Sequence, residues 1–297
     1  MKRLQQPNVS DVANLRLLAK NRALASFPAL RTNTRAILHS YIAYRRVTGN
    51  TLAAGAPVAL GLNNVLADAL RQHYTRPPAA IRPFLKTLRD TGSPDVCPMC
   101  GSLGTGTLDH VFPKADFPEF VFFSLNLVPA CLCNSKRQDN LVGAGPGQRV
   151  LHPYFDGILD QRLARAHIQP SGQHRFRRPV LQLEMLLPTT DPNYAAVSYH
   201  IDKVIRPTQV LAHFDANWPK LARRPEHYFT LPVGQVSDQM LAQAVNDTLD
   251  KKDTHYGSRN NWESMLFAGI AANAAAITFL VQRVNGLRNN VLTPQDF

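Results

Sequence analysis

All four cysteines of this chain lie between positions 97 and 133, in the pairs Cys97-Pro98-Met99-Cys100 and Cys131-Leu132-Cys133. Two close pairs in a protein without a secretion signal favour four thiolates around one structural Zn²⁺ over disulfides. The first pair has the usual spacing of a zinc knuckle. The second pair is tighter, with one residue between the sulfurs, so reduced buried thiols are the alternative. A metal here would hold together a small unit with little apolar core of its own.

The composition is that of a folded protein that favours acidic partners. Of its 297 residues, 44% are hydrophobic and 18% charged, values that exclude wholesale disorder. The net charge of +12 and the sequence pI near 9.9 favour nucleic acid or an anionic membrane surface as a partner.

Neither a leader nor a membrane span is predicted. The first residues carry charge without an apolar run behind them, so a cytoplasmic location is the default expectation. The apolar stretch from Met265 to Val281 is interrupted by Asn273 and Thr278 and is shorter than the roughly 20 residues that a span needs. We predict a buried core helix there and no membrane partner.

Periodicity and composition divide the chain into three regions, a helical one over 1–90, one rich in glycine, proline and cysteine over 91–160, and a mixed one over 161–297. The first shows apolar spacing of three and four, with Ser10 as a helix cap. The third contains strand-like segments at 180–185 and 196–201, then helix candidates near 207–223, 236–251 and 260–285. The predicted class is α+β, with mainly helical regions flanking the small central one.

Polar residues of a distinctive kind lie between and after the cysteine pairs. The chain reads Leu108-Asp109-His110-Val111-Phe112-Pro113-Lys114, then Leu125-Asn126-Leu127-Val128-Pro129-Ala130, and Cys131-Leu132-Cys133-Asn134-Ser135-Lys136-Arg137. Over about residues 97–140 this resembles the HNH endonuclease family in its version with flanking zinc knuckles. Taken singly, these residues would be read as turn residues, a strand histidine and helix caps. Their order and spacing favour the resemblance.

The resemblance implies that residues 91–160 form a nuclease core with a zinc knuckle and a ββα-metal fold, in which a strand–strand–helix site surrounds one divalent ion. Asp109 and Asn134 would be ligands of Mg²⁺ or Mn²⁺, which prefer oxygen donors, with Asn134 in place of the family's frequent final histidine. His110 would be the general base that deprotonates water. Asn126 would bridge backbone groups of the loop that carries His110.

Cations around this segment would hold the substrate. Lys114, Lys136 and Arg137 are expected to contact DNA phosphates, with exposed solubilising charge as the alternative. His152 follows a glycine-rich loop and is either near the phosphate or a packing residue. A further group of cations could extend the DNA-facing surface: Arg175, Arg177, Arg178, Lys220, Arg223 and Arg224.

These residues imply a metal-dependent endonuclease that hydrolyses phosphodiester bonds, most readily of double-stranded DNA. The resemblance extends to HNH proteins that accompany an ATPase or another subunit in anti-phage defence of the Septu type or in restriction. A double-strand break would require pairing of two copies. The alternative is a non-catalytic zinc-knuckle subunit that binds nucleic acid within a larger complex; it would keep the cysteines and the charge without needing Asp109, His110 and Asn134 together.

Overall fold

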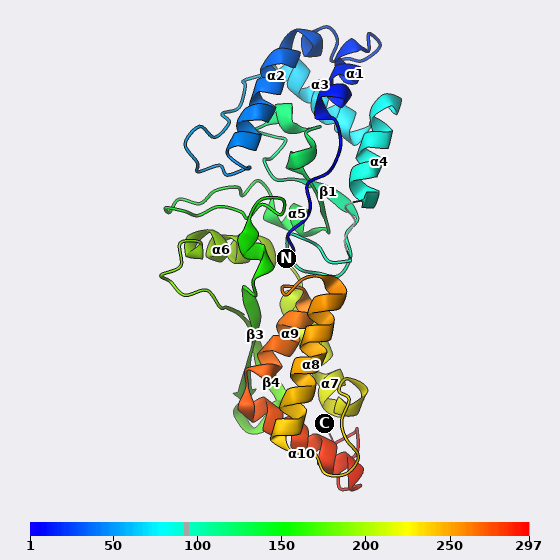
Figure 1. Ribbon diagram of the computed structural model, residues 1–297, viewed down its shortest axis with the longest axis vertical. Helices are drawn as coiled ribbons and strands as arrows, with labels where there is room; N and C mark the ends of the chain where they lie inside the picture. Colours follow the sequence, from blue (N-terminus) through cyan, green and yellow to red (C-terminus); the bar gives the residue numbers. More distant parts are fainter. Residues whose placement is uncertain (92–94, 297) are drawn as a thin grey trace.

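The computed structural model describes residues 1–91 and 95–296. Figure 1 shows an elongated molecule, with the N-terminal helices at one end, the C-terminal helices at the other, and irregular chain with short elements between them. Helices make up most of the regular structure, and the described chain contains two separate two-stranded sheets. The predicted α+β class is confirmed.

Four helices form the N-terminal end. They are α1 (Asp11–Lys20), α2 (Ala29–Arg46), α3 (Asn64–Thr75) and α4 (Arg82–Thr91). Ser10 caps α1 as predicted, since its hydroxyl accepts a hydrogen bond from the Ala13 N–H at 3.3 Å, and Asn63 caps α3 in the same way. Their apolar faces turn inward and bury Leu18, Ile37 and Leu66 among others.

Two strands and a short helix follow in the middle of the molecule. Strand β1 (Thr107–His110) pairs antiparallel with β2 (Leu127–Ala130), with His110 opposite Leu127. Helix α5 (Cys133–Arg137) begins three residues after β2 ends. Both strands are almost wholly buried, so the polar side chains that they carry need partners inside the protein.

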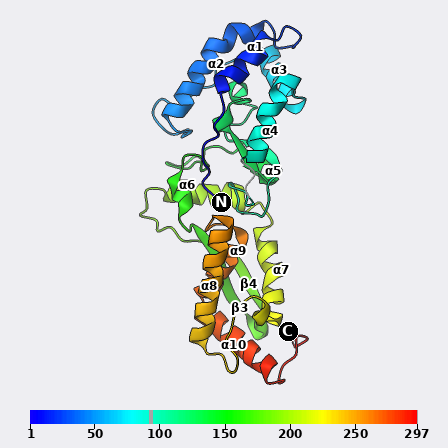
Figure 2. The ribbon, with the colours of Figure 1, turned by 45° about the vertical axis from the view of Figure 1, so that its right-hand side comes forward.

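The C-terminal end is built on a β-hairpin, β3 (Ala164–Ser171) and β4 (Arg175–Met185). Helices α7 (Val210–Arg223), α8 (Asp238–Tyr256), α9 (Trp262–Ala271) and α10 (Ala274–Arg288) gather around it, as Figure 2 shows from a second side. Helix α9 lies directly on β3 at Gly269, where a Cβ atom would come within 2.2 Å of the Ala166 carbonyl oxygen. Only glycine permits this close approach.

One predicted strand is wrong. Residues 196–201 alternate in polarity, but they belong to α6 (Tyr194–His200), which continues into a π-helical turn over Ile201–Ile205. Its buried residues include Val197, His200, Ile201 and Val204. This is helical spacing, and it becomes clear only when the pattern is followed past position 201.

The predicted helix over 260–285, and with it the single core helix over Met265–Val281, is two helices. The first ends at Ala271, and Asn273 caps the second, because its side-chain oxygen accepts a hydrogen bond from the Ala276 N–H at 3.0 Å. The expected burial is correct for α9, which is buried from Ser264 to Ile270, but not for the start of α10, where Ala274 and Ala275 are exposed. Within the described chain no single helix has the length and apolar character to cross a membrane; α9 and α10 pass such a test only as a pair bent by 91°.

Segments from the N-terminal and the C-terminal half of the chain both contact the loop of the first cysteine pair. Its backbone oxygens accept hydrogen bonds from distant segments: Pro98 from the Lys2 N–H, Met99 from His200, and Cys100 and Gly101 from Trp262 of α9. Buried apolar side chains form one connected core along the chain. The domain boundary expected at 90/91 adjoins residues 92–94, which lie outside the described residues.

Candidate functional site

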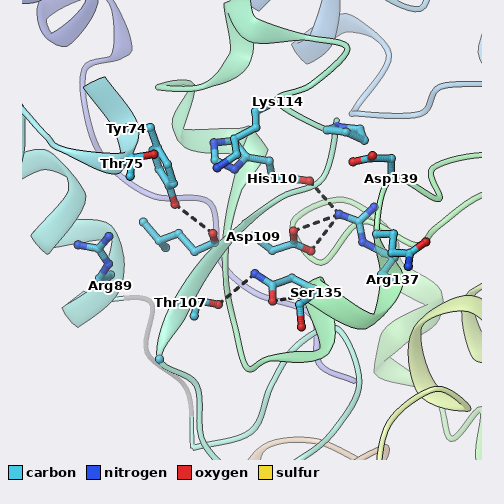
Figure 3. Close-up of a pocket in the computed structure, with 15 residues that line it drawn as sticks. Tyr74, Thr75, Arg89, Thr107, Asp109, His110, Lys114, Ser135, Arg137 and Asp139 are labelled. Atoms are coloured by element: carbon cyan, nitrogen blue, oxygen red, sulfur yellow. Dashed lines mark hydrogen bonds and ion pairs between the residues drawn. The ribbon is translucent and has the colours of Figure 1, made fainter. Parts of the chain in front are cut away.

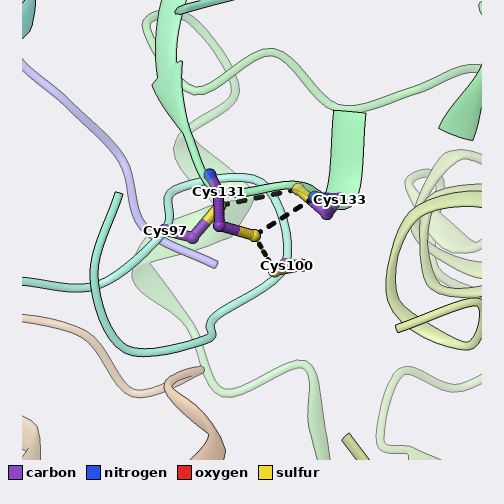
Figure 4. Close-up of side chains that lie close together, drawn as sticks. All are labelled: Cys97, Cys100, Cys131 and Cys133. Atoms are coloured by element: carbon purple, nitrogen blue, oxygen red, sulfur yellow. Dashed lines mark hydrogen bonds between the residues drawn. The ribbon is translucent and has the colours of Figure 1, made fainter. Parts of the chain in front are cut away.

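The four cysteine thiols converge on one point (Figure 4). Their sulfur atoms all lie within 4.8 Å of one another, with Cys97 and Cys133 3.6 Å apart and Cys100 and Cys131 3.5 Å apart. A tetrahedral zinc site with bonds of about 2.3 Å separates its sulfurs by about 3.8 Å. The cluster is therefore a candidate metal centre whose donors and spacing fit Zn²⁺.

The tight spacing of the second pair does not keep either thiol out of the cluster. Cys131 directly follows β2 and Cys133 begins α5, and the short turn between them brings both sulfurs to the same cluster. Backbone N–H groups donate to the cluster as well, from Cys131 to the Cys97 sulfur at 3.4 Å and from Cys133 to the Cys131 sulfur at 3.3 Å. Hydrogen bonds among the thiols lower the pKa of Cys131 and Cys97 and raise the pKa of Cys100 and Cys133, so two of the four sulfurs favour the thiolate form that metals bind.

A cleft of about 640 Å³ runs along β1 and reaches α5 (Figure 3). Asp109 and His110 of β1, Lys114 of the following loop, and Asn134 and Arg137 of α5 all line it. Tyr74 of α3 and Arg89 of α4 form the opposite wall. The structure thus brings the predicted base, both predicted oxygen ligands and two of the predicted cations to one cleft.

His110 is held in a defined orientation. Its Nε2 lies 3.2 Å from the Val121 carbonyl oxygen, and its ring packs edge-on against Tyr74 with centroids 4.5 Å apart. A carbonyl only accepts, so Nε2 carries the proton and Nδ1 has the free lone pair. Burial lowers the pKa of His110 to about 3. The ring is therefore neutral near pH 7, the form in which it can take a proton.

Asp109 forms a buried ion pair with Arg137. The Arg137 Nη2 lies 3.1 Å from each carboxylate oxygen and 2.9 Å from the His110 carbonyl oxygen, while Nη1 donates to the Asn140 carbonyl at 2.9 Å. Burial raises the pKa of the Asp109 carboxyl, and the neighbouring guanidinium opposes that rise. These two charges stabilise each other out of water.

The interpretation of Arg137 as an exposed phosphate contact needs correction. The side chain is only 2% exposed, and its guanidinium points into the protein toward β1. Arg137 follows Asn134 by about one helical turn, and its side chain faces inward. A helix of only five residues is too short for its buried face to be predicted from the sequence. Lys136 is exposed and does not line the cleft, whereas Lys114 lines it with its ammonium 5.0 Å from the centre of the Tyr74 ring.

Asn126 is completely buried and does not reach the cleft surface. Its oxygen accepts from the Phe112 N–H at 2.7 Å, and its amide nitrogen donates to the carbonyls of Phe112 at 3.1 Å and Phe120 at 3.3 Å. The amide therefore connects the chain that follows His110 to the turn before β2.

A second layer of polar groups lies behind Asn126. Tyr44 of α2 donates toward the Asn126 oxygen at 3.2 Å, and its hydroxyl lies 2.8 Å from His152 Nε2. His152 Nδ1 accepts from the Tyr154 N–H, so Nε2 is the protonated nitrogen and donates to Tyr44. His152 was predicted to lie either near the phosphate or within the packed interior. The structure shows the second, because the side chain is buried and does not line the cleft. The sequence pattern did not indicate a role for Tyr44 at the site, because this residue occupies an ordinary buried position of α2.

Asn134 offers one oxygen to the cleft. That oxygen accepts from the Ser135 N–H at 2.7 Å, and the amide nitrogen donates to the Thr107 hydroxyl at 3.3 Å. A carboxylate and an amide oxygen that line one cleft are donors that suit a hard cation such as Mg²⁺, and both Asp109 oxygens also accept from Arg137. The donor set therefore fits a weakly held divalent ion and leaves most of its positions to water and substrate.

Fold and site together define an α+β protein in which a four-cysteine candidate zinc site is joined to a polar, partly cationic cleft. No protein-family model matches the chain, and no solved structure matches it. A segment of 66 residues is 38% identical to the protein named ea31 of Escherichia phage lambda. That segment is 22% of this chain and 22% of the phage protein, so the likeness is local and names no activity.

Proposed function

We propose that this protein is a metal-dependent endonuclease of the HNH type that hydrolyses DNA phosphodiester bonds. The observation that carries the proposal is the meeting of Asp109, His110 and Asn134 in one cleft on a strand–strand–helix unit. Each residue type suits the role that the sequence resemblance implies, and the net charge of +12 suits a polyanionic substrate.

The proposed chemistry follows from the free lone pair of His110. Nδ1 removes a proton from a water molecule, the water oxygen forms a bond to phosphorus, and the bond from phosphorus to the 3′ oxygen breaks. A divalent cation on Asp109 and Asn134 would polarise the phosphate and stabilise charge on the leaving oxygen. Lys114 adds positive charge at the cleft wall, and Asn126 holds the backbone beside His110 in place.

The alternative is a zinc-knuckle subunit that binds nucleic acid without cutting it. Such a module has no need of a neutral, oriented histidine beside a carboxylate in a solvent-filled cleft, and this observation favours the enzyme. The setting that the sequence resemblance suggests, anti-phage defence with an ATPase or another subunit, is part of the proposal. The local likeness to one protein of phage lambda neither supports nor opposes it.

Cleavage of supercoiled plasmid tests the proposal. We expect purified protein to nick or linearise the plasmid with Mg²⁺ or Mn²⁺, to be inactive in EDTA, and to lose activity on substitution His110→Ala. Arg35→Ala, which removes an exposed cation of α2 outside the cleft, serves as the control and should keep most activity. DNA binding without cleavage under every metal condition would instead support the binding module.

A further inference from the structure

A second hollow, of about 280 Å³, lies in the C-terminal half between β4 and α7. Arg177 and Arg178 of β4 and Arg223 at the end of α7 line it, together with the single carboxylate Asp215. Its remaining walls are apolar or aromatic: Pro179, Leu181, Trp218 and Pro219. We call this feature the arginine hollow.

The arginine hollow is rigid beneath its charges. Trp218 is 1% exposed, and its indole N–H donates to the Phe176 carbonyl at 2.8 Å, so the helix is fixed to the strand below the arginines. Arg177 and Arg178 are exposed side chains on a paired strand. Within the described chain neither makes an ion pair with a carboxylate.

Positive charge is concentrated at this hollow, where three arginines and one aspartate line the walls. Arg283 lies under the hollow, and its pKa is lowered by burial first and by the proximity of Arg177 second. Acidic groups among the described residues nearby include Asp215 at the wall and Asp296, whose pKa is lowered first by hydrogen bonds from Thr293 and then by the charges of Arg283 and Arg177. A concave and mainly cationic surface with apolar walls concentrates its field and attracts an anion.

The placement of the arginine hollow relates it to the cleft. Helix α4 borders the cleft through Arg89, and α7 borders the hollow through Arg223. In Figures 1 and 2 both helices lie on the same side of the long axis of the molecule. A duplex that enters the cleft and runs along this side would pass the hollow.

We propose that the arginine hollow binds the sugar-phosphate backbone of duplex DNA, as a second contact that holds the substrate while the cleft acts on it. This inference rests on the proposed function for the identity of the partner. Phosphate contacts of this kind fix register and add affinity without reading sequence. Arg177 and Arg178 are substrate-positioning residues and take no part in the chemistry.

The test measures binding apart from cleavage. DNA affinity is determined by fluorescence anisotropy in EDTA on the His110→Ala background, across a series of duplex lengths and salt concentrations. We expect affinity to rise once the duplex is long enough to reach both sites, and R177Q/R178Q to abolish that rise. Losing two phosphate contacts should reduce the slope of log affinity against log salt by about 1.8, at about 0.9 per contact.

Three controls keep the result interpretable. R177K/R178K retains the charges and should keep the salt slope. R31Q/R35Q removes two exposed cations of α2, which lies on the opposite side of the N-terminal half in both views, and should leave the slope unchanged. Unchanged thermal unfolding of R177Q/R178Q excludes a folding defect.

An equal salt slope and length dependence in R177Q/R178Q would overturn the inference, and so would absence of DNA binding by the parent protein. The proposed function is decided separately, by metal-dependent cleavage. A nuclease whose binding ignores Arg177 and Arg178 would therefore refute the second contact alone.

Discussion

At the residue scale, the candidate site depends on burying charge and on supplying each charge with a partner. Asp109 carries the predicted metal-binding carboxylate, yet it is buried and faces Arg137. A carboxylate in such a place is expensive to keep ionised unless a cation is fixed beside it. Arg137 thus keeps Asp109 ionised and oriented. The sequence pattern did not predict this role, because it placed Arg137 on the surface as a contact for DNA phosphates.

Removing this partner should destabilise the fold. Arg137→Met leaves the Asp109 charge buried and unpaired, and we expect a loss of about 3–5 kcal/mol in the free energy of unfolding. The double variant D109N/R137M removes both charges and should recover much of that loss. Urea unfolding of the two variants checks this. Equal destabilisation in both would show that the ion pair does not hold α5 to β1.

At the scale of elements, two features that periodicity does not predict shape the C-terminal half. These are the close backbone approach at Gly269 and the helix cap at Asn273. The predicted first helices and the β4 strand are confirmed, because long apolar faces with caps are strong signals. The strand predicted at 196–201 and the long helix at 260–285 failed, because a short alternating run is ambiguous and Asn273 was read as a polar residue within a helix. The ββα order of the site could be predicted only from the motif.

The contact of α9 with β3 gives a prediction at this scale. Gly269→Ala would place a Cβ atom within 2.2 Å of the Ala166 backbone oxygen, so the helix must move away from the strand. We expect a loss of stability of about 1–3 kcal/mol, measured by thermal unfolding. Gly106→Ala is the control, because nothing lies within 4 Å of its added methyl group. Similar melting of both variants would contradict the packing described for α9.

At the scale of the whole molecule, three buried histidines make stability depend on pH. Burial lowers the pKa values of His110, His152 and His200 to about 3 each. Each unfolded histidine binds a proton below about pH 6.5 while the folded one does not, so the unfolded state gains as the pH falls. The raised pKa of Asp109 opposes this, because the folded state then binds a proton at a pH above the unfolded pKa of about 3.9, where the unfolded carboxyl is ionised.

Stability should therefore decrease steeply below pH 6.5 and be flat, as far as these three groups are concerned, between pH 7 and 8. Three protons correspond to a slope of up to about 4 kcal/mol per pH unit. Urea unfolding at intervals between pH 4.5 and 8 measures it. Constant stability from pH 8 down to 5 would show that these histidines are not buried in their neutral form.

Metal removal is the second prediction for the whole molecule. The cysteine loop accepts hydrogen bonds from both halves, including two from Trp262 of α9. If the thiols hold a metal ion, stripping it with a strong chelator should lower the melting temperature and increase amide exchange at the start of α9 and around His200. Amide exchange in α10, which lies at the C-terminal end of the molecule away from the loop (Figure 1), is the internal reference. Bound metal that can be removed without change in exchange would contradict this role for the loop.

Chemical rescue of His110→Gly tests the central claim most directly, because it asks whether the ring at this position supplies the base. We predict that the wild-type protein cleaves DNA with Mg²⁺ or Mn²⁺, that His110→Gly does not, and that free imidazole diffusing into the space of the missing ring restores part of the activity. Cleavage by His110→Gly at the wild-type rate without imidazole, or absence of metal-dependent cleavage by the wild type, would contradict the account.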